Sequence, residues 1–437
     1  MERRNLTLDL PSKRTKVYKS SLARNTGWMM AGQGSNFFLQ AGYFLVLTRL
    51  LGVTEFGVFA GAFALVNSVT PYSSLGSSMI FMRYVSADRS LAQVYWGNIL
   101  AITSVSSLPL MLILALVGRA LLGHRSVGLI TILVVANCFM SQIVNSAGSV
   151  FQTFEQLRAT AWLQTLSNLL RLVVMAILLL CLHHATAFQC ALGILISSTL
   201  AAVTAIFSVR SSIGRIHISG KLFRLRFWEG LGFSFAGSTQ ALYNDVDKMM
   251  LSHYGMNAAN GIYTMAYRIV DFSNTPVSAL DAALLPRFFT LHREGFAAVS
   301  RMARKVLPIA VAAGVAAAIC TLLASPLLVR IVGHGFGDAL LAIRWLCWLP
   351  ALRAVHQLTG GVLTSTGRQN YRTGAQFTVA LFNLSLNLIL IPKHGWLGAA
   401  WASLASDGAL GAINLILVFL FVGTWNSQQP INHPKTV

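Results

Sequence analysis

Apolar runs long enough to cross a bilayer recur along nearly the whole chain, separated by short polar segments. An α-helix needs roughly 20 mostly apolar residues to span the hydrocarbon core. The polar segment 210–228 falls close to the midpoint and predicts a linker between two halves. The runs predict twelve spans, at 25–48, 56–81, 92–117, 127–150, 159–181, 187–209, 229–252, 258–284, 305–332, 338–363, 373–391 and 396–422.

The predicted fold is an all-α membrane protein with two six-helix lobes, related by pseudo-two-fold symmetry, around a central cavity. The domain boundaries follow from the spans. They are a cytoplasmic basic N-terminal segment (1–24), a first lobe (25–209), a cytoplasmic basic linker (210–228), a second lobe (229–422) and a cytoplasmic tail (423–437).

An internal repeat favours this two-lobe arrangement. Residues 52–83 are similar to residues 255–287, with an offset of about 204 positions. Because each half has six spans, both halves keep the same orientation and the symmetry axis runs along the membrane normal. The matched positions are Gly57 with Gly261, Phe63 with Tyr267, Pro71 with Pro276 and Leu75 with Leu280.

Composition confirms that lipid is the solvent for most of the chain. Of its 437 residues 55% are hydrophobic and only 11% are charged, whereas about a quarter of a soluble domain is charged. The N-terminus is polar and basic and leads into a first span, so no cleavable signal peptide is expected. Cysteines lie in apolar runs without metal-like or disulfide-like spacing, at Cys138, Cys181, Cys190, Cys320 and Cys347.

The positive charge predicts the orientation. With the N-terminus inside, 23 of the 33 Lys and Arg residues fall on inner segments and five on outer loops. This bias places both termini in the cytoplasm. It also explains the net charge of +20 without nucleic acid, since the basic residues line span ends beside anionic headgroups.

Polar residues inside the spans share helical faces. In the eighth span they fall within an arc of about 80°, at Asn260, Tyr263, Tyr267, Asp271, Asn274, Ser278 and Asp281. Similar stripes mark the first, fourth, fifth and seventh spans. Polar side chains facing lipid are costly, so the stripes predict a hydrated cavity. The alternative is interhelical hydrogen bonding, worth about 0.6 kcal/mol per contact.

The polar and charged positions give two sets of candidate residues. Cations and amides suit the phosphates and sugar of an anionic ligand, because Arg donates two parallel hydrogen bonds to phosphate. This set is Arg24, Arg49, Asn36, Gln40, Arg171, Asn244, Lys248, Tyr267, Arg268 and Arg353. Carboxylates could bind a coupling Na⁺ or H⁺, or form ion pairs, such as Asp247 and Asp271 with Lys248 and Arg268. That set is Asp245, Asp247, Asp271 and Asp281.

No catalytic or metal-binding motif is present in the sequence. It has no GxxxxGK[ST] loop for ATP and no HExxH or cysteine-rich metal pattern. The short outer loops argue against a polymerase or a glycosyltransferase. We therefore expect a protein that is not an enzyme and that needs no cofactor or metal.

Two stretches carry a family resemblance. The first resembles the N-terminal signature of bacterial polysaccharide-biosynthesis flippases and reads LTRLLGVTEFGVFAGAFALVNSVTPYSSLGSSMIFMRYVS. The second is similar to part of the C-terminal half of those flippases and reads YNDVDKMMLSHYGMNAANGIYTMAYRIVDF. These flippases include the O-antigen and exopolysaccharide flippases of the multidrug/oligosaccharidyl-lipid/polysaccharide exporter superfamily. The resemblance covers residues 25–422 and leaves the sugar undefined.

The resemblance implies a function. It implies translocation of undecaprenyl-diphosphate-linked oligosaccharide from the cytoplasmic to the periplasmic leaflet of the bacterial inner membrane, by alternating access. By position, Arg24, Arg49 and Arg268 look similar to arginines that face the diphosphate in lipid II flippases, which have two further spans that this chain lacks. The implied partners are the lipid-linked oligosaccharide, membrane lipids, and the polymerase and glycosyltransferases of the same pathway. A cation-coupled drug or small-molecule exporter of the superfamily is the alternative.

Overall fold

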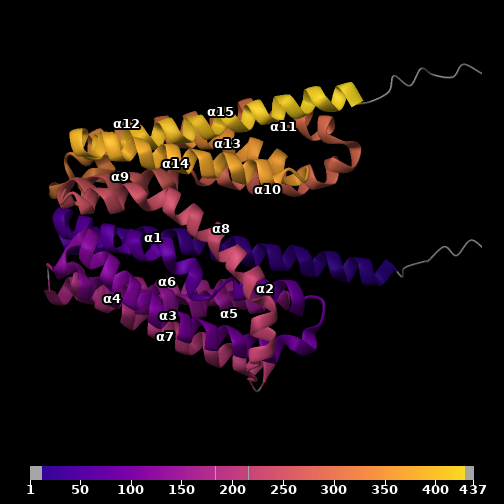
Figure 1. Cartoon of the computed structure of the whole chain (residues 1–437), viewed down its shortest axis with the longest axis horizontal. Coiled ribbons are helices and arrows are strands. Elements are labelled where there is room, and N and C mark those ends of the chain that lie inside the picture. The colour runs from indigo at the N-terminus through magenta and orange to yellow at the C-terminus, as the bar shows by residue number, and fades with distance from the viewer. Residues whose placement is uncertain (1–11, 183, 215, 429–437) are drawn as a thin grey trace, which may run out of the picture. The chain divides into compact units, whose positions relative to one another are not determined.

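The protein is built from helices, and no strand occurs in the part of the chain that the structure covers (Figure 1). The computed structural model describes the backbone of residues 12–182, 184–214 and 216–428. It describes the side chains of residues 33–422 except 183, 215, 223, 293 and 334. The predicted all-α membrane fold is therefore confirmed.

Long helices separated by short turns make up both halves of the chain. The first half contains α1 (Ser12–Val69), α2 (Ser77–Val85), α3 (Ala92–Leu122), α4 (Val127–Val134), a π-helix (Val135–Ser141), α5 (Gln142–Thr153), α6 (Leu157–Leu182) and α7 (Ala187–Ile213). The second half contains α8 (Gly220–His253), α9 (Asn257–Ser273), α10 (Thr275–Leu291), α11 (Phe296–Val332), α12 (Ala339–Leu346), α13 (Leu349–Ser365), α14 (Gln369–His394) and α15 (Trp396–Gln428).

Nine helical stretches of the described chain are long and apolar enough to cross a membrane. The first, Gln33–Val85, contains most of both the first and second predicted spans. The seventh and eighth predicted spans fall on α8, α9 and α10, which lie outside these nine because they carry more polar and charged residues. The chain is thus a multi-pass membrane protein, and the count of twelve spans stays a prediction.

The two repeat segments break their helices in the same way. Gly52, with φ 66°, interrupts α1, and a 3₁₀ turn containing Pro71 separates α1 from α2. In the second segment Asn274 separates α9 from α10, and Pro276 occupies the first turn of α10. Proline is tolerated in a first turn because the amide there needs no intrahelical partner. Pro276 therefore lies just after the break between α9 and α10.

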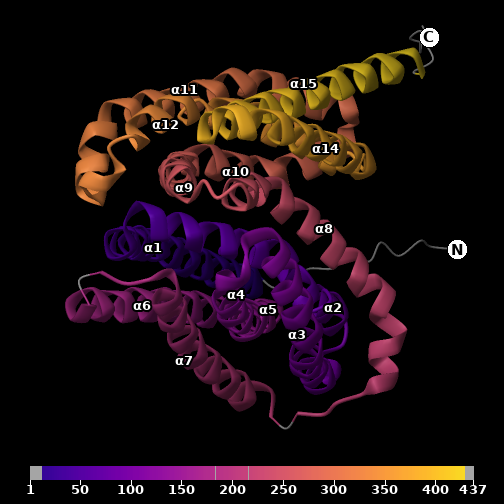
Figure 2. The same cartoon turned by 60° about the vertical axis from the view of Figure 1, so that its left-hand side comes forward.

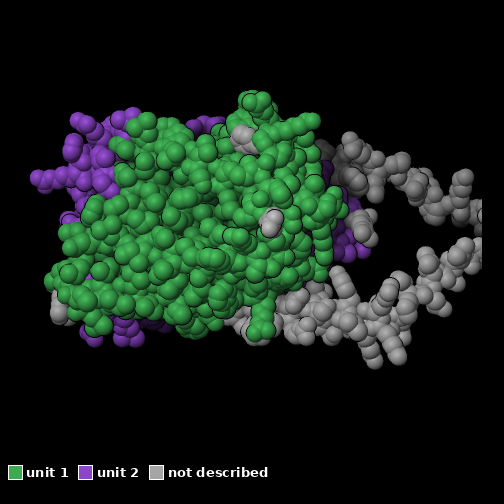
Figure 3. All heavy atoms as spheres, turned by 90° about the horizontal axis from the view of Figure 1, so that it is seen from below, with its two compact units in different colours: residues 1–47, 69–115, 130–237 green, residues 48–68, 116–129, 238–437 purple. Residues whose placement is uncertain are grey.

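The helices form two compact units, coloured separately in Figure 3. Unit 1 takes in the described chain up to Leu47 together with 69–115 and 130–237. Unit 2 takes in 48–68, 116–129 and the chain from Ser238 onward. These units follow contacts, so they do not coincide with the predicted lobes at 25–209 and 229–422, and that division stays a prediction.

Unit 1 packs around α2, α3, α5, α6 and α7. Large side chains fill its core, including Phe81, Trp96 and Leu163, each no more than 2% exposed. Small residues on α7, such as Ala202 and Ala205, let neighbouring helices approach closely. Such small-residue packing replaces the hydrophobic drive that lipid cannot supply between helices.

Unit 2 packs α11, α13 and α15 against one another, and α14 runs beside α15 in both cartoon views (Figures 1 and 2). Phe288, Phe296 and Val362 are fully or almost fully buried between α10, α11 and α13. Unit 2, which also contains α9 and the second half of α8, carries most of the charged residues considered next.

Candidate functional site

Arg353 is the centre of a charged cluster in unit 2. It lies about one turn into α13, and its side chain is 13% exposed. Its Nη1 donates to Asp271 Oδ1 at 2.8 Å, and its Nε donates to Asp407 Oδ2 at 3.2 Å. Its Nη2 donates to the hydroxyl of Tyr267 at 2.5 Å. One guanidinium therefore joins carboxylates from α9 and α15.

Lys248 is neutralised on its own helix. Its Nζ lies 2.5 Å from Asp245 Oδ1, three residues earlier on α8. Residues three apart share a helix face, so this pair forms without backbone adjustment. The other carboxylate oxygen of Asp245 accepts a hydrogen bond from Asn67 Nδ2 at 2.7 Å. The ammonium also lies 4.7 Å from the ring centroid of Tyr267.

Asp247 is the most buried carboxylate of the cluster, at 3% exposure. Its Oδ2 accepts a hydrogen bond from the Tyr263 hydroxyl at 2.5 Å, and its Oδ1 accepts one from the Lys248 backbone amide at 2.7 Å. The Ser403 hydroxyl also donates to Oδ2, at 3.4 Å. No salt bridge to Asp247 forms among the side chains that the structure describes.

The cluster thus holds more carboxylates than cations. Lys248 and Arg353 face the four carboxylates of Asp245, Asp247, Asp271 and Asp407. Burying charge in a low-dielectric interior is favourable only when partners and hydrogen bonds offset the lost water. Every one of these carboxylates has at least one such partner, so the arrangement is consistent with ion pairs or with binding of a further cation.

Unit 1 presents the opposite charge balance. Arg171 on α6 donates from Nη2 to the hydroxyl of Ser141 at 2.9 Å, at the end of the π-helix. The acidic residues of unit 1 with described side chains are Asp88 and Glu155, which lie in turns, and Glu229, which lies within α8 at the first residue of a predicted span. No carboxylate in this part of the structure forms a salt bridge with Arg171.

Arg268 is a second cation without a salt bridge in the described chain. It lies on α9 in unit 2, and its side chain is exposed while those of Tyr267 and Ile269 beside it are buried. None of the salt bridges within residues 33–422 involves it. Arg171 and Arg268 therefore differ from Lys248 and Arg353, whose charges are already engaged.

Comparison with known proteins identifies the family. The sequence profile of the family described as "Polysaccharide biosynthesis protein" matches residues 22–292, more than half of the chain. The chain belongs to this polysaccharide biosynthesis protein family. A comparison with curated proteins finds no match.

Solved structures similar to this family member are transporters of the MOP superfamily. An inward-facing multidrug resistance MATE family transporter aligns with a TM-score of 0.76 and 12% identity, covering 91% of this chain and 96% of the other. An outward-facing one aligns with 0.63 and 15% identity, covering 94% and 97%. A MOP superfamily transporter from Pyrococcus furiosus, described by the reverse polarity of its binding pocket, gives 0.64 and 13%, covering 93% and 96%. The chain has the fold of these transporters.

Ion pairing in this family member differs from the pairing considered from sequence. The sequence interpretation paired Asp247 with Lys248 and Asp271 with Arg268. Instead, Lys248 pairs with Asp245, and Asp271 pairs with Arg353. Adjacent residues of a helix point about 100° apart, so Asp247 cannot easily reach the ammonium of Lys248.

The remaining predicted ligand residues lie in varied surroundings. Asn36 is buried and accepts a hydrogen bond from Asn168 Nδ2 at 3.1 Å, whereas Gln40 and Asn244 are exposed. Arg49 donates from Nε and Nη2 to the Ile331 carbonyl at 2.9 and 2.6 Å, which caps the C-terminus of α11. The side chain of Arg24 lies outside the described residues.

Asp281 stands apart from the charged cluster. It lies on α10 and is half-buried, and its Oδ1 is a buried atom without a hydrogen-bond partner. A Cβ placed on Gly361 of α13 would lie 3.4 Å from that oxygen, so α13 passes close to the carboxylate. No salt bridge to Asp281 forms among the side chains that the structure describes.

Several residues of the cluster were absent from the sequence-based site. Tyr243 donates to Asp407 Oδ1 at 2.7 Å, and His356 Nε2 lies 3.7 Å from the same oxygen. Asp407 had a signal in the sequence, because a carboxylate within an apolar span is rare and needs a partner. Tyr243 and His356 had none, since nothing local marks which span they face.

Proposed function

We propose that this protein moves a polyprenyl-diphosphate-linked oligosaccharide across the bacterial inner membrane, from the cytoplasmic to the periplasmic leaflet. The oligosaccharide is a repeat unit of O-antigen, capsule or exopolysaccharide. Transport proceeds by alternating access, with both termini in the cytoplasm. Membership of a polysaccharide biosynthesis family and the fold of MOP transporters support this proposal together.

The physical problem is the diphosphate. An isolated charge moved from water into hydrocarbon costs far more than folding contacts can return. The protein must therefore offer the phosphates hydrogen-bond donors and positive charge, while the polyprenyl tail stays in lipid. Amides and arginines within the spans fulfil this requirement for both phosphates and sugar.

The observation that carries the proposal is the state of Arg171. It is a half-buried cation on an apolar helix, its Nη2 is held by the neutral hydroxyl of Ser141, and no described carboxylate forms a salt bridge with it. An arginine partly withdrawn from water is stabilised by an anion that offsets its lost hydration. Because no described carboxylate pairs with Arg171, we assign that role to the diphosphate of the cargo.

Arg268 is assigned the same role from unit 2. Its exposed side chain and lack of a salt bridge among the described residues leave its guanidinium open to a ligand. Lys248 and Arg353 are assigned to the protein's own carboxylates, so in this proposal they support the site without binding phosphate.

Replacement of either of these two arginines tests the function. Arg171→Ala and Arg268→Ala are expected to lower surface polysaccharide at least about tenfold in a deletion strain, because each removes a charge-assisted hydrogen bond to phosphate. Lipid-linked repeat units should accumulate on the inner leaflet. Surface polysaccharide is measured by immunoblot, and the intermediates by mass spectrometry of extracted lipids.

Arg344→Gln is the matched control, because Arg344 is an exposed arginine on α12 that lies outside the proposed site. It should leave export unchanged. Arg268→Lys, which keeps the charge, should recover part of the activity. Normal polysaccharide with both alanine variants, at wild-type protein levels, would contradict the proposal.

A cation-coupled exporter of the same superfamily is the second candidate. The excess of carboxylates in unit 2 favours it, since Asp247 is buried with hydroxyl and amide partners and no salt bridge among the described side chains. Under this alternative, Asp245, Asp247 and Asp271 bind Na⁺ or H⁺, and the cargo is a small molecule. Sensitivity of the Asp247→Asn strain to toxic cations, with normal polysaccharide, would favour this candidate.

A further inference from the structure

Helix α8 belongs to both compact units. It spans Gly220–His253 as one helix, and the chain leaves unit 1 at Gly237 and enters unit 2 at Ser238. The chain of α1 makes the opposite passage, from unit 2 into unit 1, after Ser68. A helix bends sharply only where its sequence or packing permits it. A movement of one unit against the other must therefore break contacts of α8 or use such a point.

The first half of α8 is fixed to α2 by charged and aromatic contacts within unit 1. Glu229 Oε1 accepts from Arg83 Nη1 at 2.7 Å, and Oε2 accepts from the Tyr84 hydroxyl at 3.0 Å. Arg226 pairs with the same carboxylate at 3.9 Å, and its guanidinium stacks 3.9 Å from the centroid of the Tyr84 ring. One carboxylate of α8 thus binds a cation and a hydroxyl of α2.

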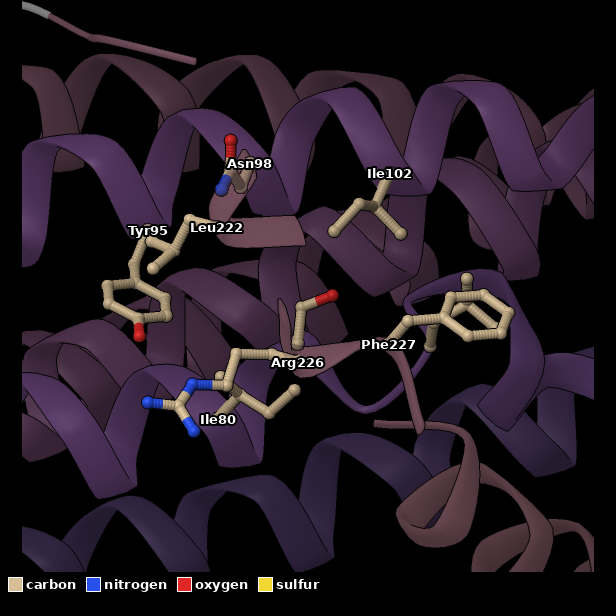
Figure 4. A pocket seen from close by; sticks show the side chains of 9 residues that line it. Ile80, Tyr95, Asn98, Ile102, Leu222, Arg226 and Phe227 are labelled. Carbon is tan, nitrogen blue, oxygen red and sulfur yellow. The ribbon is translucent and has the colours of Figure 1, made fainter. Parts of the chain in front are cut away.

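Packing on α3 and on the turn before α2 extends this attachment. A Cβ on Gly230 would overlap the Leu75 carbonyl oxygen, so the two backbones touch there. The start of α8 also lies beside α3. The residues that line a small pocket at this contact include Leu222, Arg226 and Phe227 of α8 and Tyr95, Asn98 and Ile102 of α3 (Figure 4).

The second half of α8 is fixed in unit 2 by hydrogen bonds to α15 and α9. Tyr243 donates to Asp407 of α15 at 2.7 Å, and Asp247 accepts from Tyr263 of α9 at 2.5 Å. Asp247 and Asp407 are both buried. Each half of α8 is therefore anchored in a different unit.

Between the two anchors α8 meets the proline turn that follows α1. The Ser234 hydroxyl donates to the Pro71 carbonyl at 2.9 Å, and the Ser238 hydroxyl donates to the Ser68 carbonyl. A Cβ on Gly237 would lie 3.2 Å from the Pro71 ring. Small residues of α8 thus pack on the helix break at Pro71, where both helices pass from one unit to the other.

Gly232, in the same stretch of α8, is a glycine that packing does not explain. It is exposed, and nothing lies within 4 Å of the place that an added methyl would take. Glycine is less favourable than alanine in a helix interior, because it loses more backbone freedom on folding. A glycine where alanine would fit makes the helix easier to deform.

We propose that α8 bends within Gly232–Gly237 during the transport cycle, with the turn at Pro71 as the pivot. Each half of the helix then keeps its contacts within its own unit, so neither Glu229 nor Tyr243 has to release its partners. The inference rests on the alternating access proposed above and adds the element that deforms.

The distance between two spin labels across this stretch tests the bend without any cargo. The labels are attached at Arg224→Cys and Gln240→Cys, both exposed positions, after the exposed Cys181 and Cys320 are changed to serine. A straight helix holds the two backbones about 24 Å apart. In nanodiscs, the wild type should show a second, shorter distance. Gly232→Ala should reduce this component about fivefold, since alanine favours the regular helix by that factor.

Gly374→Ala on α14 is the matched control, because its added methyl also meets nothing within 4 Å. It should leave the distances and export unchanged, whereas Gly232→Ala should lower export at an unchanged or higher midpoint of thermal unfolding. A single narrow distance in the wild type, or equal effects of the two variants, would overturn the bend. A lower unfolding midpoint in Gly232→Ala would do the same, because the glycine would then be needed for packing. Wild-type export by Gly232→Ala, with the shorter distance removed, would overturn its role in transport.

Discussion

Arg353 uses Nε, Nη1 and Nη2 to hold three oxygen atoms from α9 and α15. An arginine at the centre of a span costs about 2.5–3.5 kcal/mol on insertion scales. That cost is offset here because the guanidinium meets two carboxylates and a hydroxyl in a fixed fork geometry. Through these contacts Arg353 links α13 to α9 and α15.

Arg353→Met should destabilise the protein by about 3 kcal/mol, because it leaves the buried Asp407 without its arginine, whereas the half-exposed Asp271 is partly solvated. Thermal unfolding in detergent, followed by the fluorescence of a thiol-reactive dye, measures the change. Arg353→Met combined with Asp271→Asn and Asp407→Asn should recover most of the loss, since no carboxylate then needs a partner. A single variant as stable as the wild type would show that the cluster does not stabilise unit 2.

Residue-level pairing was only partly accessible from sequence. The pair of Asp245 and Lys248 follows from helix geometry alone, because residues three apart share a face. Arg353 is separated by 82 and 54 residues from Asp271 and Asp407. No local pattern specifies such contacts, since they depend on how α9, α13 and α15 pack.

Among the helices, the matched glycines of the repeat contact each other's segments reciprocally in unit 2. A Cβ on Gly57 would lie 1.7 Å from the Asn257 carbonyl oxygen, and a Cβ on Gly261 would lie 2.0 Å from the Val53 carbonyl oxygen. Both partners are related by the repeat offset of about 204 residues. This reciprocity is what a pseudo-two-fold axis between Gly57 and Gly261 produces.

Gly57→Ala and Gly261→Ala should each destabilise the protein by about 1–3 kcal/mol, because an added methyl overpacks a backbone contact. The midpoint of thermal unfolding in detergent reports the effect. Gly374→Ala is the control on α14, since nothing lies within 4 Å of the place that its added methyl would take. It should be neutral or slightly stabilising. Equal stability of all three variants would refute close packing at the crossing.

Element boundaries followed from sequence where proline and glycine mark them. The breaks near Pro71 and Pro276 and the interruption at Gly52 all coincide with such residues. The π-helix Val135–Ser141 had no such mark, because its sequence continues the apolar pattern of α4. Its wider turn, with hydrogen bonds between residues i and i+5, depends on packing, and such turns frequently occur at functional sites. Here Ser141 meets Arg171.

Across the whole molecule, the carboxylates within spans lie mainly in unit 2. Asp245, Asp247, Asp271, Asp281 and Asp407 lie there, whereas unit 1 has only Glu229, at the first residue of a predicted span, among its described side chains. Hydropathy and the internal repeat were sufficient to predict an all-α membrane protein with two similar halves. The excess of carboxylates in the second half of the chain was also visible in the sequence. The sequence did not show which cations these carboxylates neutralise, because that depends on the ion pairs of Lys248 and Arg353. Arg171 has no such pair among the described side chains.

This charge distribution leads to a prediction about the driving force. A membrane potential, inside negative, favours outward movement of an anion by about 2.3 kcal/mol per charge per 100 mV. For the proposed diphosphate-linked cargo, we therefore predict that the potential alone is sufficient to drive outward movement. In proteoliposomes, a valinomycin-induced potassium diffusion potential should accelerate translocation of a fluorescent polyprenyl-diphosphate oligosaccharide, and the opposite potential should slow it. Arg268→Ala should abolish the response.

The same assay separates the two candidate functions. At zero potential, a proton or sodium gradient should have little effect if the carboxylates of unit 2 serve only as ion pairs. If such a gradient drives transport and Asp247→Asn removes the effect, the carboxylate excess couples cation movement to the cycle. Translocation that is insensitive to potential in the wild type would contradict electrophoretic export, because a charged headgroup that crosses the membrane field without compensation must respond to it.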